Sequence, residues 1–384
     1  MVNRVTRKNQ DLVSELPLTI SAQYGLIDQN EFFDKRVASK DVSGYYLIEN
    51  GEFAYNKSTS TDAPWGAVKR LDHYENGVLS TLYIVFGIKE NNPIDSNFLV
   101  SYYNTNLWHK GIREIAAEGA RNHGLLNIVP ADFFETELMI PQDIEEQKQI
   151  GKFFKELEAL ITLHQRKYDK LQIIKKAMLE KMFPQNGSCF PEIRFKGFTD
   201  SWEQRKLGEL GEIMTGSTPS TSKSEYYSED GIPWVTPTDI NSQTISDTPR
   251  KLSGEGIKVG RVVPANTILC TCIASIGKNT LLTVKGSFNQ QINCLTPNEY
   301  NDAYFLLTES EIWSNIMKRM AAAGTMQIVN KTEFSELTTM VPKLEEQKKI
   351  GQYFHTIGHL ITLHQREVEK LQNIKKSMLE TMFV

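Results

Sequence analysis

Few residues of this chain have types and spacings that could do chemistry. Cys270 and Cys272 lie one residue apart in ILCTCIA, where a strand would turn both thiols to the same face. This spacing matches no zinc pattern, and the sequence places no histidine cluster nearby. We interpret both cysteines as buried, reduced thiols, and predict no metal site here.

Two other stretches resemble catalytic motifs without completing them. Residues 272–279, CIASIGKN, end in Gly-Lys like a phosphate loop, but a cysteine replaces the first glycine and Asn279 replaces the metal-binding Ser/Thr. Residues 92–94, Asn-Pro-Ile, fall short of the Asn-Pro-Pro-aromatic motif of amino-methyltransferases. We expect no catalytic residue and no bound cofactor in this chain, and no methyltransferase, ATPase or nuclease activity of its own. Polar loops without a catalytic constellation are typical of a recognition protein.

The elements that would position such loops occur twice. Residues 145–183 and 345–383 are identical at 25 of 39 aligned positions, and residues 127–141 resemble residues 327–342. Two copies of one element at this separation predict two copies of a larger unit with pseudo-twofold symmetry.

Each copy of the repeat has apolar residues at alternating spacings of four and three and contains no proline. This heptad pattern predicts a helix of roughly 55 Å that must bury its apolar stripe. The two copies are the obvious partners for each other, paired antiparallel. The seam residues that we single out are Leu157, Ile161, His164, Leu171, Ile357, Ile361, His364 and Leu371. We interpret the two histidines as a polar layer that fixes the register, with a metal or catalytic role as the alternative.

The remaining sequence predicts mixed α+β domains. Short apolar runs at 81–88, 267–274 and 279–284 predict strands, and residues 106–117 and 310–320 predict short helices. We place a first domain at 1–140, a first spacer helix at 141–183, a second domain at 184–341 and a second spacer helix at 342–384.

Composition limits the class of protein. The chain has 384 residues, enough for two domains with their own cores. It has no apolar run long enough to cross a membrane, and its polar start lacks the apolar core of a signal peptide, so we expect a cytoplasmic protein without a membrane partner. The net charge of −4 argues against nucleic acid as a partner unless the basic residues gather on one face.

Several segments together resemble one family. They are RFKGFTDSWEQRKLGEL (194–210, here called the opening segment), GIPWVTPTDI (231–240), residues 262–292, and the helix start P-x-x-EEQKKI. SAQYGLIDQNEFFDKRV, YNKSTS and GVLSTLYIVF match first-domain sequences of the same family. The chain resembles the specificity (S) subunit of a type I restriction–modification system, over nearly its whole length.

The resemblance implies an α+β protein with two pseudo-symmetric target-recognition domains, each reading half of a split site in double-stranded DNA. It implies that the two long helices form an antiparallel coiled coil, which spaces the domains and docks two modification (M) subunits. Paired helices of roughly 55 Å could hold two DNA-reading surfaces about one DNA turn (roughly 34 Å) apart. The M subunits would bind S-adenosylmethionine and methylate adenine N6, and restriction (R) subunits would use ATP and Mg.

One feature departs from the family pattern. The W-x-x-x-K-L-G motif at 202–208 precedes the second domain, but the first domain begins at Met1 without a counterpart. Either the first domain lacks part of the usual start, or residues 195–210 serve both domains by permutation. The missing counterpart keeps open the alternative of a silent or recombination-donor product that does not assemble. A catalytic methyltransferase or nuclease chain is a separate alternative.

Polar residues in turns beside apolar strands are the candidates for DNA contact, because such side chains can reach base edges. In the first domain they are Ser21, Gln23, Tyr24, Tyr55, Asn56, Lys57, Ser58, Arg70, Arg121, Asn122 and His123. In the second they are Thr218, Ser220, Trp234, Thr236, Thr238, Asp239, Ser275, Lys278, Asn289, Gln290 and Gln291. The alternatives are that Tyr55 and Trp234 belong to the core, that residues 289–291 bond neighbouring backbone, and that Lys278 contacts phosphate rather than a base.

Overall fold

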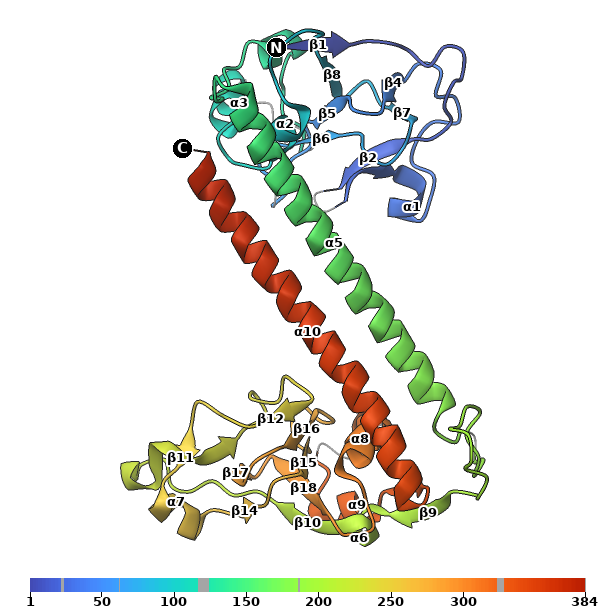
Figure 1. Ribbon diagram of the computed structural model, residues 1–384, viewed down its shortest axis with the longest axis vertical. Helices are drawn as coiled ribbons and strands as arrows, with labels where there is room; N and C mark the ends of the chain where they lie inside the picture. Colours follow the sequence, from blue (N-terminus) through green and yellow to red (C-terminus); the bar gives the residue numbers. More distant parts are fainter. Residues whose placement is uncertain (22–23, 62, 117–123, 186, 323–327, 384) are drawn as a thin grey trace. The chain divides into compact units, whose positions relative to one another are not determined.

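The computed structural model describes residues 1–21, 24–61, 63–116, 124–185, 187–322 and 328–383. The chain forms two compact units. Unit 1 comprises Met1–Leu163 and Val368–Val384, and unit 2 comprises His164–Glu367. Each unit contains one globular domain together with part of each long helix, α5 (Ile144–Lys181) and α10 (Leu344–Met382) (Figure 1).

Unit 1 is built on a four-stranded antiparallel sheet in the order β1-β8-β5-β6. Two separate two-stranded antiparallel sheets, β2–β3 and β4–β7, belong to the same unit. The strands are β1 Val2–Val5, β2 Leu18–Ser21, β3 Gly25–Asp28, β4 Tyr46–Glu49, β5 Phe53–Asn56, β6 Ala67–Arg70, β7 Asn76–Leu79 and β8 Ile84–Ile88. The helices of the domain are α1 Gln29–Phe33, α2 Ser96–Tyr102, α3 His109–Ile115 and α4 Pro130–Phe134.

Unit 2 has a five-stranded sheet in the order β10-β18-β15-β16-β12 and a four-stranded sheet in the order β13-β11-β17-β14. Its strands are β9 Glu203–Lys206, β10 Gly211–Thr215, β11 Tyr227–Val235, β12 Thr244–Ile245, β13 Lys251–Leu252, β14 Val262–Val263, β15 Thr267–Thr271, β16 Asn279–Leu282, β17 Gly286–Phe288, β18 Ile292–Pro297 and β19 Thr338–Val341. Its helices are α6 Leu207–Leu210, η1 Ser224–Tyr226, α7 Gly254–Val259, α8 Ala303–Ala322 and α9 Lys331–Glu336.

The two units repeat one plan. The order β1-β8-β5-β6 in unit 1 corresponds to β10-β18-β15-β16 in unit 2, and in both the first pair is antiparallel. The predicted strands at 81–88, 267–274 and 279–284 are β8, β15 and β16, while the predicted helix at 310–320 is part of the longer α8. The repeat seen in the sequence therefore extends through the sheets, where the sequence alone does not reveal it.

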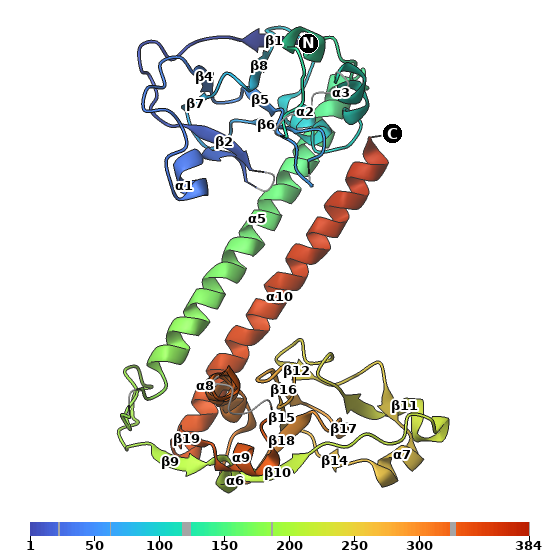
Figure 2. The same cartoon turned by 180° about the vertical axis from the view of Figure 1, so that it is seen from behind.

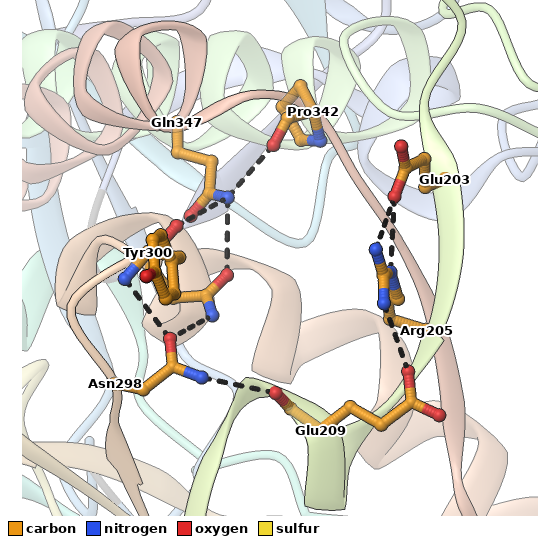
Figure 3. Close-up of polar contacts among 8 residues, drawn as sticks. Glu203, Arg205, Glu209, Asn298, Tyr300, Pro342 and Gln347 are labelled. Carbon is orange, nitrogen blue, oxygen red and sulfur yellow. Dashed lines mark hydrogen bonds and ion pairs between the residues drawn. The ribbon is translucent and has the colours of Figure 1, made fainter.

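A buried glutamine joins each long helix to its own domain in the same way. In unit 1, Oε1 of Gln147 accepts from the backbone N–H of Asp95 (2.9 Å), and its Nε2 donates to the carbonyl of Pro141 (2.9 Å). In unit 2, Gln347 makes the same two bonds, with Asp302 and Pro342 (both 2.9 Å). Figure 3 shows the bond to Pro342. Both glutamines are inaccessible to solvent, so these bonds fix the start of each helix against its domain.

A glycine one turn later lets the same elements approach closely. A Cβ at Gly151 would lie 2.5 Å from the backbone nitrogen of Phe98, at the start of α2. A Cβ at Gly351 would lie 2.4 Å from Oδ1 of Asp302, which caps the start of α8 by accepting from Phe305 N–H. Any side chain at either glycine would push the helix off its domain.

The long helices pack antiparallel within each unit (Figures 1 and 2). In unit 1, Phe154 near the start of α5 lies 5.8 Å from Phe383 after the end of α10, measured between ring centroids. In unit 2, Phe183 lies 5.8 Å from Phe354. The predicted antiparallel coiled coil is confirmed, and each buried phenylalanine contributes roughly 1.5–3 kcal/mol by leaving water.

The predicted seam residues face inward to different degrees. Leu157, Ile161, Ile357 and Ile361 are buried, whereas Leu171 and Leu371 are half-buried. Nδ1 of His164 lies 3.1 Å from Nδ1 of His364, and the two rings share a hydrogen bond whose donor is set by their tautomers. Desolvation, followed by repulsion from His164 and Lys167, lowers the pKa of His364 and favours the neutral form of that ring.

Replacing Ile161 and Ile361 together with Asp should destabilise the chain by several kcal/mol, because each carboxylate would be buried without a partner. Thermal unfolding followed by circular dichroism measures the loss. The double replacement of Leu163 and Leu363 with Asp is the matched control, since both leucines are exposed on the same helices. Equal unfolding temperatures for the two double variants would contradict the seam assignment.

Candidate nucleic-acid interface

In unit 2 a parallel strand pair brings two predicted loops together. β11 and β17 run parallel, with Val235 beside Phe288 at their ends. Asn289 N–H donates to the carbonyl of Val235 (3.0 Å), which holds the following residues side by side. Residues 236–239 and 289–291, both chosen from the sequence, therefore leave the sheet at one edge.

A third loop, residues 216–220, lies against the same edge. Ser217 N–H donates to the carbonyl of Phe288 (2.9 Å), and the side chains of Thr218 and Gln290 are hydrogen-bonded. Gly216 is required here, because a Cβ would lie 2.1 Å from the carbonyl oxygen of Asn289. Ser220, further along the loop, is exposed.

The fourth loop, residues 272–278, is joined to the loop at 289–291 by a backbone hydrogen bond. Cys272 N–H donates to the carbonyl of Gln291 (2.8 Å), and Lys278 N–H donates to Oγ1 of Thr271 (2.9 Å). The side chains of Ser275 and Lys278 are exposed. Asn279, at the position of a phosphate-loop Ser/Thr, instead donates its amide to Ser310 and Ser314 of α8 and so serves the fold.

Some of the predicted second-domain residues are buried or bonded within the fold, so their side chains are not available for contact with DNA. Trp234 is buried and donates its indole N–H to the carbonyl of Ser217 (3.1 Å), as the core alternative anticipates. One carboxylate oxygen of Asp239 accepts from the backbone (2.8 Å) and hydroxyl (2.6 Å) of Thr236 and closes that turn. Asn289 is buried and bonded to Gln291. The exposed members are Thr218, Ser220, Thr238, Ser275, Lys278 and Gln290.

Two arginines that the sequence analysis did not select lie beside these loops. The exposed Arg250 has its guanidinium carbon 5.3 Å from the ring centroid of Tyr227 and 5.9 Å from that of Trp234. The backbone N–H of Arg261 donates to the Ser217 hydroxyl (2.9 Å), and its guanidinium donates to the carbonyl of Thr215 (2.5 Å). Nothing local in the sequence marks them, because their place depends on which strands pair. Guanidinium groups that are fixed in place beside polar loops are suited to contact DNA phosphates.

In unit 1 several predicted residues serve the fold. Tyr55 is fully buried, stacks on Phe133 (4.9 Å between centroids) and donates its hydroxyl to the carbonyl of Trp65 (2.8 Å). Burial strongly raises the pKa of the Tyr55 hydroxyl, which stays neutral.

Arg70 and Ser21 are also engaged within unit 1. Arg70 pairs with Asp72 (2.7 Å) and donates to Ser96 and Asn97 of α2 (2.7 and 3.0 Å). Ser21 is buried and accepts from the backbone N–H of Tyr24. These bonds account for both side chains without DNA.

The other first-domain candidates differ in exposure. Tyr24 and Ser58 are exposed, while Asn56 and Lys57 are half-buried. The Asn56 side chain donates to the Tyr83 hydroxyl (3.4 Å) and accepts from Ser58 N–H (3.0 Å). Gln23, Arg121, Asn122 and His123 lie outside the described residues.

Unit 1 also has a pocket, lined in part by basic residues, that the sequence did not predict. It has a volume of about 490 Å³ and is lined by Pro64, Trp65, Asn106, His109, Lys110 and Arg113. Lys110 and Arg113 are exposed and three residues apart on α3, so they point from one helix face. The i, i+3 basic pair was the available sequence signal. Burial lowers the pKa of His109 and favours its neutral form.

Metal and membrane sites can be addressed only for the part of the chain that the structure describes. There, no three His, Cys, Asp or Glu side chains gather as a metal would require. None of the described helices is long and apolar enough to span a bilayer. Cys270, Cys272 and Cys294 are buried free thiols.

Comparison with known proteins identifies relatives of one kind. The chain is 29% identical over 214 residues to the type I restriction enzyme HindI specificity subunit of Haemophilus influenzae, covering 53% of this chain and 46% of that protein. It is 28% identical over 207 residues to the MjaIX specificity subunit of Methanocaldococcus jannaschii, covering 51% and 46%. The chain thus spans about half the length of these curated relatives.

The fold has a solved counterpart. The crystal structure of the type I restriction–modification S subunit from M. genitalium matches with a TM-score of 0.65 at 13% identity, covering 100% of this chain and 96% of that chain. Residues 38–172 and 199–373 match the type I restriction modification DNA specificity domain, one region for each copy of the repeat. The chain therefore belongs to the family of type I restriction–modification DNA specificity domains.

Proposed function

We propose that this chain is the subunit that selects the DNA sequence for a type I restriction–modification complex. The main support for the proposal is the repeated domain, in which the loops at one edge of the sheets place exposed polar side chains next to arginine and lysine side chains. In unit 2 these are Gln290 and Thr218 with Arg250, Arg261 and Lys278. Each unit reads one half of a bipartite site in double-stranded DNA, with domains at 1–140 and 184–341.

The distribution of charge is consistent with separate residues contacting the phosphates and the bases. The chain as a whole carries −4, so DNA binding relies on cations placed at the loops rather than on overall attraction. Arg250, Arg261 and Lys278 supply phosphate contacts, which fix register, while Gln290 and Thr218 reach base edges. Glutamine suits adenine, and a threonine methyl suits thymine.

The paired helices (141–183 and 342–384) act as the spacer and as the docking surface for two modification subunits. Leu163 and Leu363 occupy the same position in the two repeats, and both are exposed rather than buried in the seam. On α5 the exposed Leu160 lies three residues before Leu163, and adjacent exposed leucines of this kind suit a protein partner. The modification subunits bring S-adenosylmethionine and methylate adenine, and restriction subunits bring ATP and Mg, so the complex works on DNA in the cytoplasm without catalytic residues from this chain.

Two other functions make different predictions. A catalytic chain would bind radiolabelled S-adenosylmethionine by itself, and we expect none to bind. A silent or donor product would not co-purify with a modification subunit, whereas the specificity subunit would. The repeated seam and buried glutamines favour an assembling protein.

Base-reading and phosphate-binding residues should respond differently to truncation. Gln290→Ala should cost about 1–3 kcal/mol at one base pair, because one bidentate contact is lost. Lys278→Ala should weaken binding to all sequences and lower the slope of log K against log salt by about one unit. Fluorescence anisotropy with matched and single-mismatch duplexes at several salt concentrations measures both. Gln204→Ala and Lys196→Ala, at exposed positions outside the four loops, are the controls. A Gln290→Ala loss that is the same at every duplex would refute its role in reading bases.

Specificity should divide by domain. Exchanging residues 1–140 for the first domain of another family member should change one half-site and leave the other intact, because each domain carries its own loops. The measurement is the map of methylated adenines made by the assembled complex. The two-reader proposal fails if both half-sites change, or neither does.

A further inference from the structure

The central strands of the two units correspond residue by residue. In unit 1, β8 lies between β1 and β5, and in unit 2, β18 lies between β10 and β15, with every pair antiparallel. Phe86 of β8 pairs with Phe53 of β5, as Leu295 of β18 pairs with Ile268 of β15. All four side chains are inaccessible to solvent. The start of β8 therefore takes the place in unit 1 that the start of β18 takes in unit 2.

The turns that lead into these two strands have the same hydrogen bonds. In unit 2, the carbonyl of Asn289 accepts from the N–H three residues later (3.2 Å), and its Oδ1 accepts from the N–H two residues later (3.0 Å). In unit 1, the carbonyl of Ser80 accepts from the N–H three residues later (3.0 Å), and its hydroxyl accepts from the N–H two residues later (3.4 Å). Ser80 and Asn289 each stand six residues before the matched Phe86 and Leu295. The two turns are therefore equivalent.

The loop beside each turn corresponds as well. In unit 1, Leu126 N–H donates to the carbonyl of Lys57, and in unit 2, Val329 N–H donates to the carbonyl of Cys272 (both 3.0 Å). An isolated antiparallel bridge joins the two residues next to this bond in each unit. Residues 272–278 are one of the four loops at the edge of unit 2. The loop at 57–66 therefore lies at the matching edge of unit 1.

This correspondence places two exposed side chains at the edge of unit 1. The side chain of Asn56, at the end of β5, donates to the Tyr83 hydroxyl (3.4 Å), which joins the turn to the loop at 57–66. The tip of the turn consists of Thr81 and Leu82, both exposed, and Leu82 is 55% exposed. Thr81 stands where the exposed Gln290 stands in unit 2, and Leu82 stands one residue further along.

The two tips offer different chemistry to a base. The Gln290 amide can donate and accept hydrogen bonds, whereas Thr81 and Leu82 present methyl groups. Thymine shows its C5-methyl group in the major groove, and apolar groups such as the threonine methyl contact it there. A single exposed leucine has no special meaning by itself. This leucine, however, lies in the turn that matches the base-reading turn proposed for unit 2.

We infer that Thr81 and Leu82 read bases of the half-site that unit 1 contacts, and that Leu82 contacts the methyl group of a thymine. The inference rests on the proposed function, because it assigns the reading residues of one unit. It gives unit 1 a reading turn in place of candidates such as Tyr55 and Arg70, which serve the fold. No sequence signal marks this turn, since residues 80–83 and 289–292 are identical at none of their four positions.

A selection experiment separates the readers of the two half-sites. The full chain, assembled with its modification subunits, is mixed with duplexes that carry a random central segment, and the bound duplexes are sequenced. We expect replacement of Thr81 and Leu82 together with Ala to relax the base preference in one half-site, and Gln290→Ala to relax it in the other. Replacement of Leu12 and Val13 together with Ala is the matched control, since both are exposed in unit 1 outside these loops. It should leave both half-sites unchanged.

Uracil in place of thymine tests the methyl contact directly, because uracil lacks only the C5-methyl group. In the duplex selected by the unchanged chain, one such replacement in the half-site of unit 1 should weaken binding about four-fold, the value of one methyl group leaving water. The same replacement should leave the affinity of the Leu82→Ala chain nearly unchanged. The affinity of the Gln290→Ala chain should still fall about four-fold, because the two sites act independently.

Three results would overturn the inference while the proposed function stands. The first is relaxation of the same half-site by the Thr81 and Leu82 replacement and by Gln290→Ala. The second is a bipartite preference that the Thr81 and Leu82 replacement leaves unchanged. The third is a half-site of unit 1 in which no thymine responds to uracil, or in which the Leu82→Ala chain responds as strongly as the unchanged chain. If the unchanged chain enriches no bipartite sequence, the proposed function itself is wrong, and the inference falls with it.

Discussion

The buried glutamine at the start of each long helix is the interaction on which the rest of each unit depends. Gln147 and Gln347 each bond a helix-capping loop and a proline carbonyl while shielded from water. Losing such an amide would leave buried backbone groups unpaired, at about 1–3 kcal/mol for each. Because the glutamine fixes the helix against its domain, it also fixes which face of the helix forms the seam. Gly151 and Gly351 let the two approach closely enough for these bonds to form.

The features that the sequence predicts well are those set by periodicity. The seam follows from spacings of four and three, and burial of Ile161 and Ile361 agrees with it. The strands at 267–271 and 279–282 follow from short apolar runs. Gln147 shows the limit of this reasoning, since it is identical in both repeats and yet its buried bonds to a distant loop leave no local signal.

Side chains at the interface were harder to assign, because a polar residue has no local signature of its partner. Arg70 and Asp239 are equally polar in the sequence, but each is engaged within the fold. Gln290 and Lys278 extend from the same group of loops and are exposed. Arg250 and Arg261 were missed because Arg250 comes near the loops only when β11 pairs with β13, and Arg261 only when β14 and β11 pair with β17. The proposed contact with DNA therefore depends on the assembled edge rather than on any single motif.

We propose that this chain selects the DNA sequence that a modification complex methylates. The most direct measurement is single-molecule sequencing of methylated adenines in cells with and without the gene. We expect that one bipartite motif, two short half-sites separated by a fixed gap, loses its methylation when the gene is deleted and regains it on complementation. An unchanged set of methylated motifs in cells that express the partner subunits would contradict the proposed function.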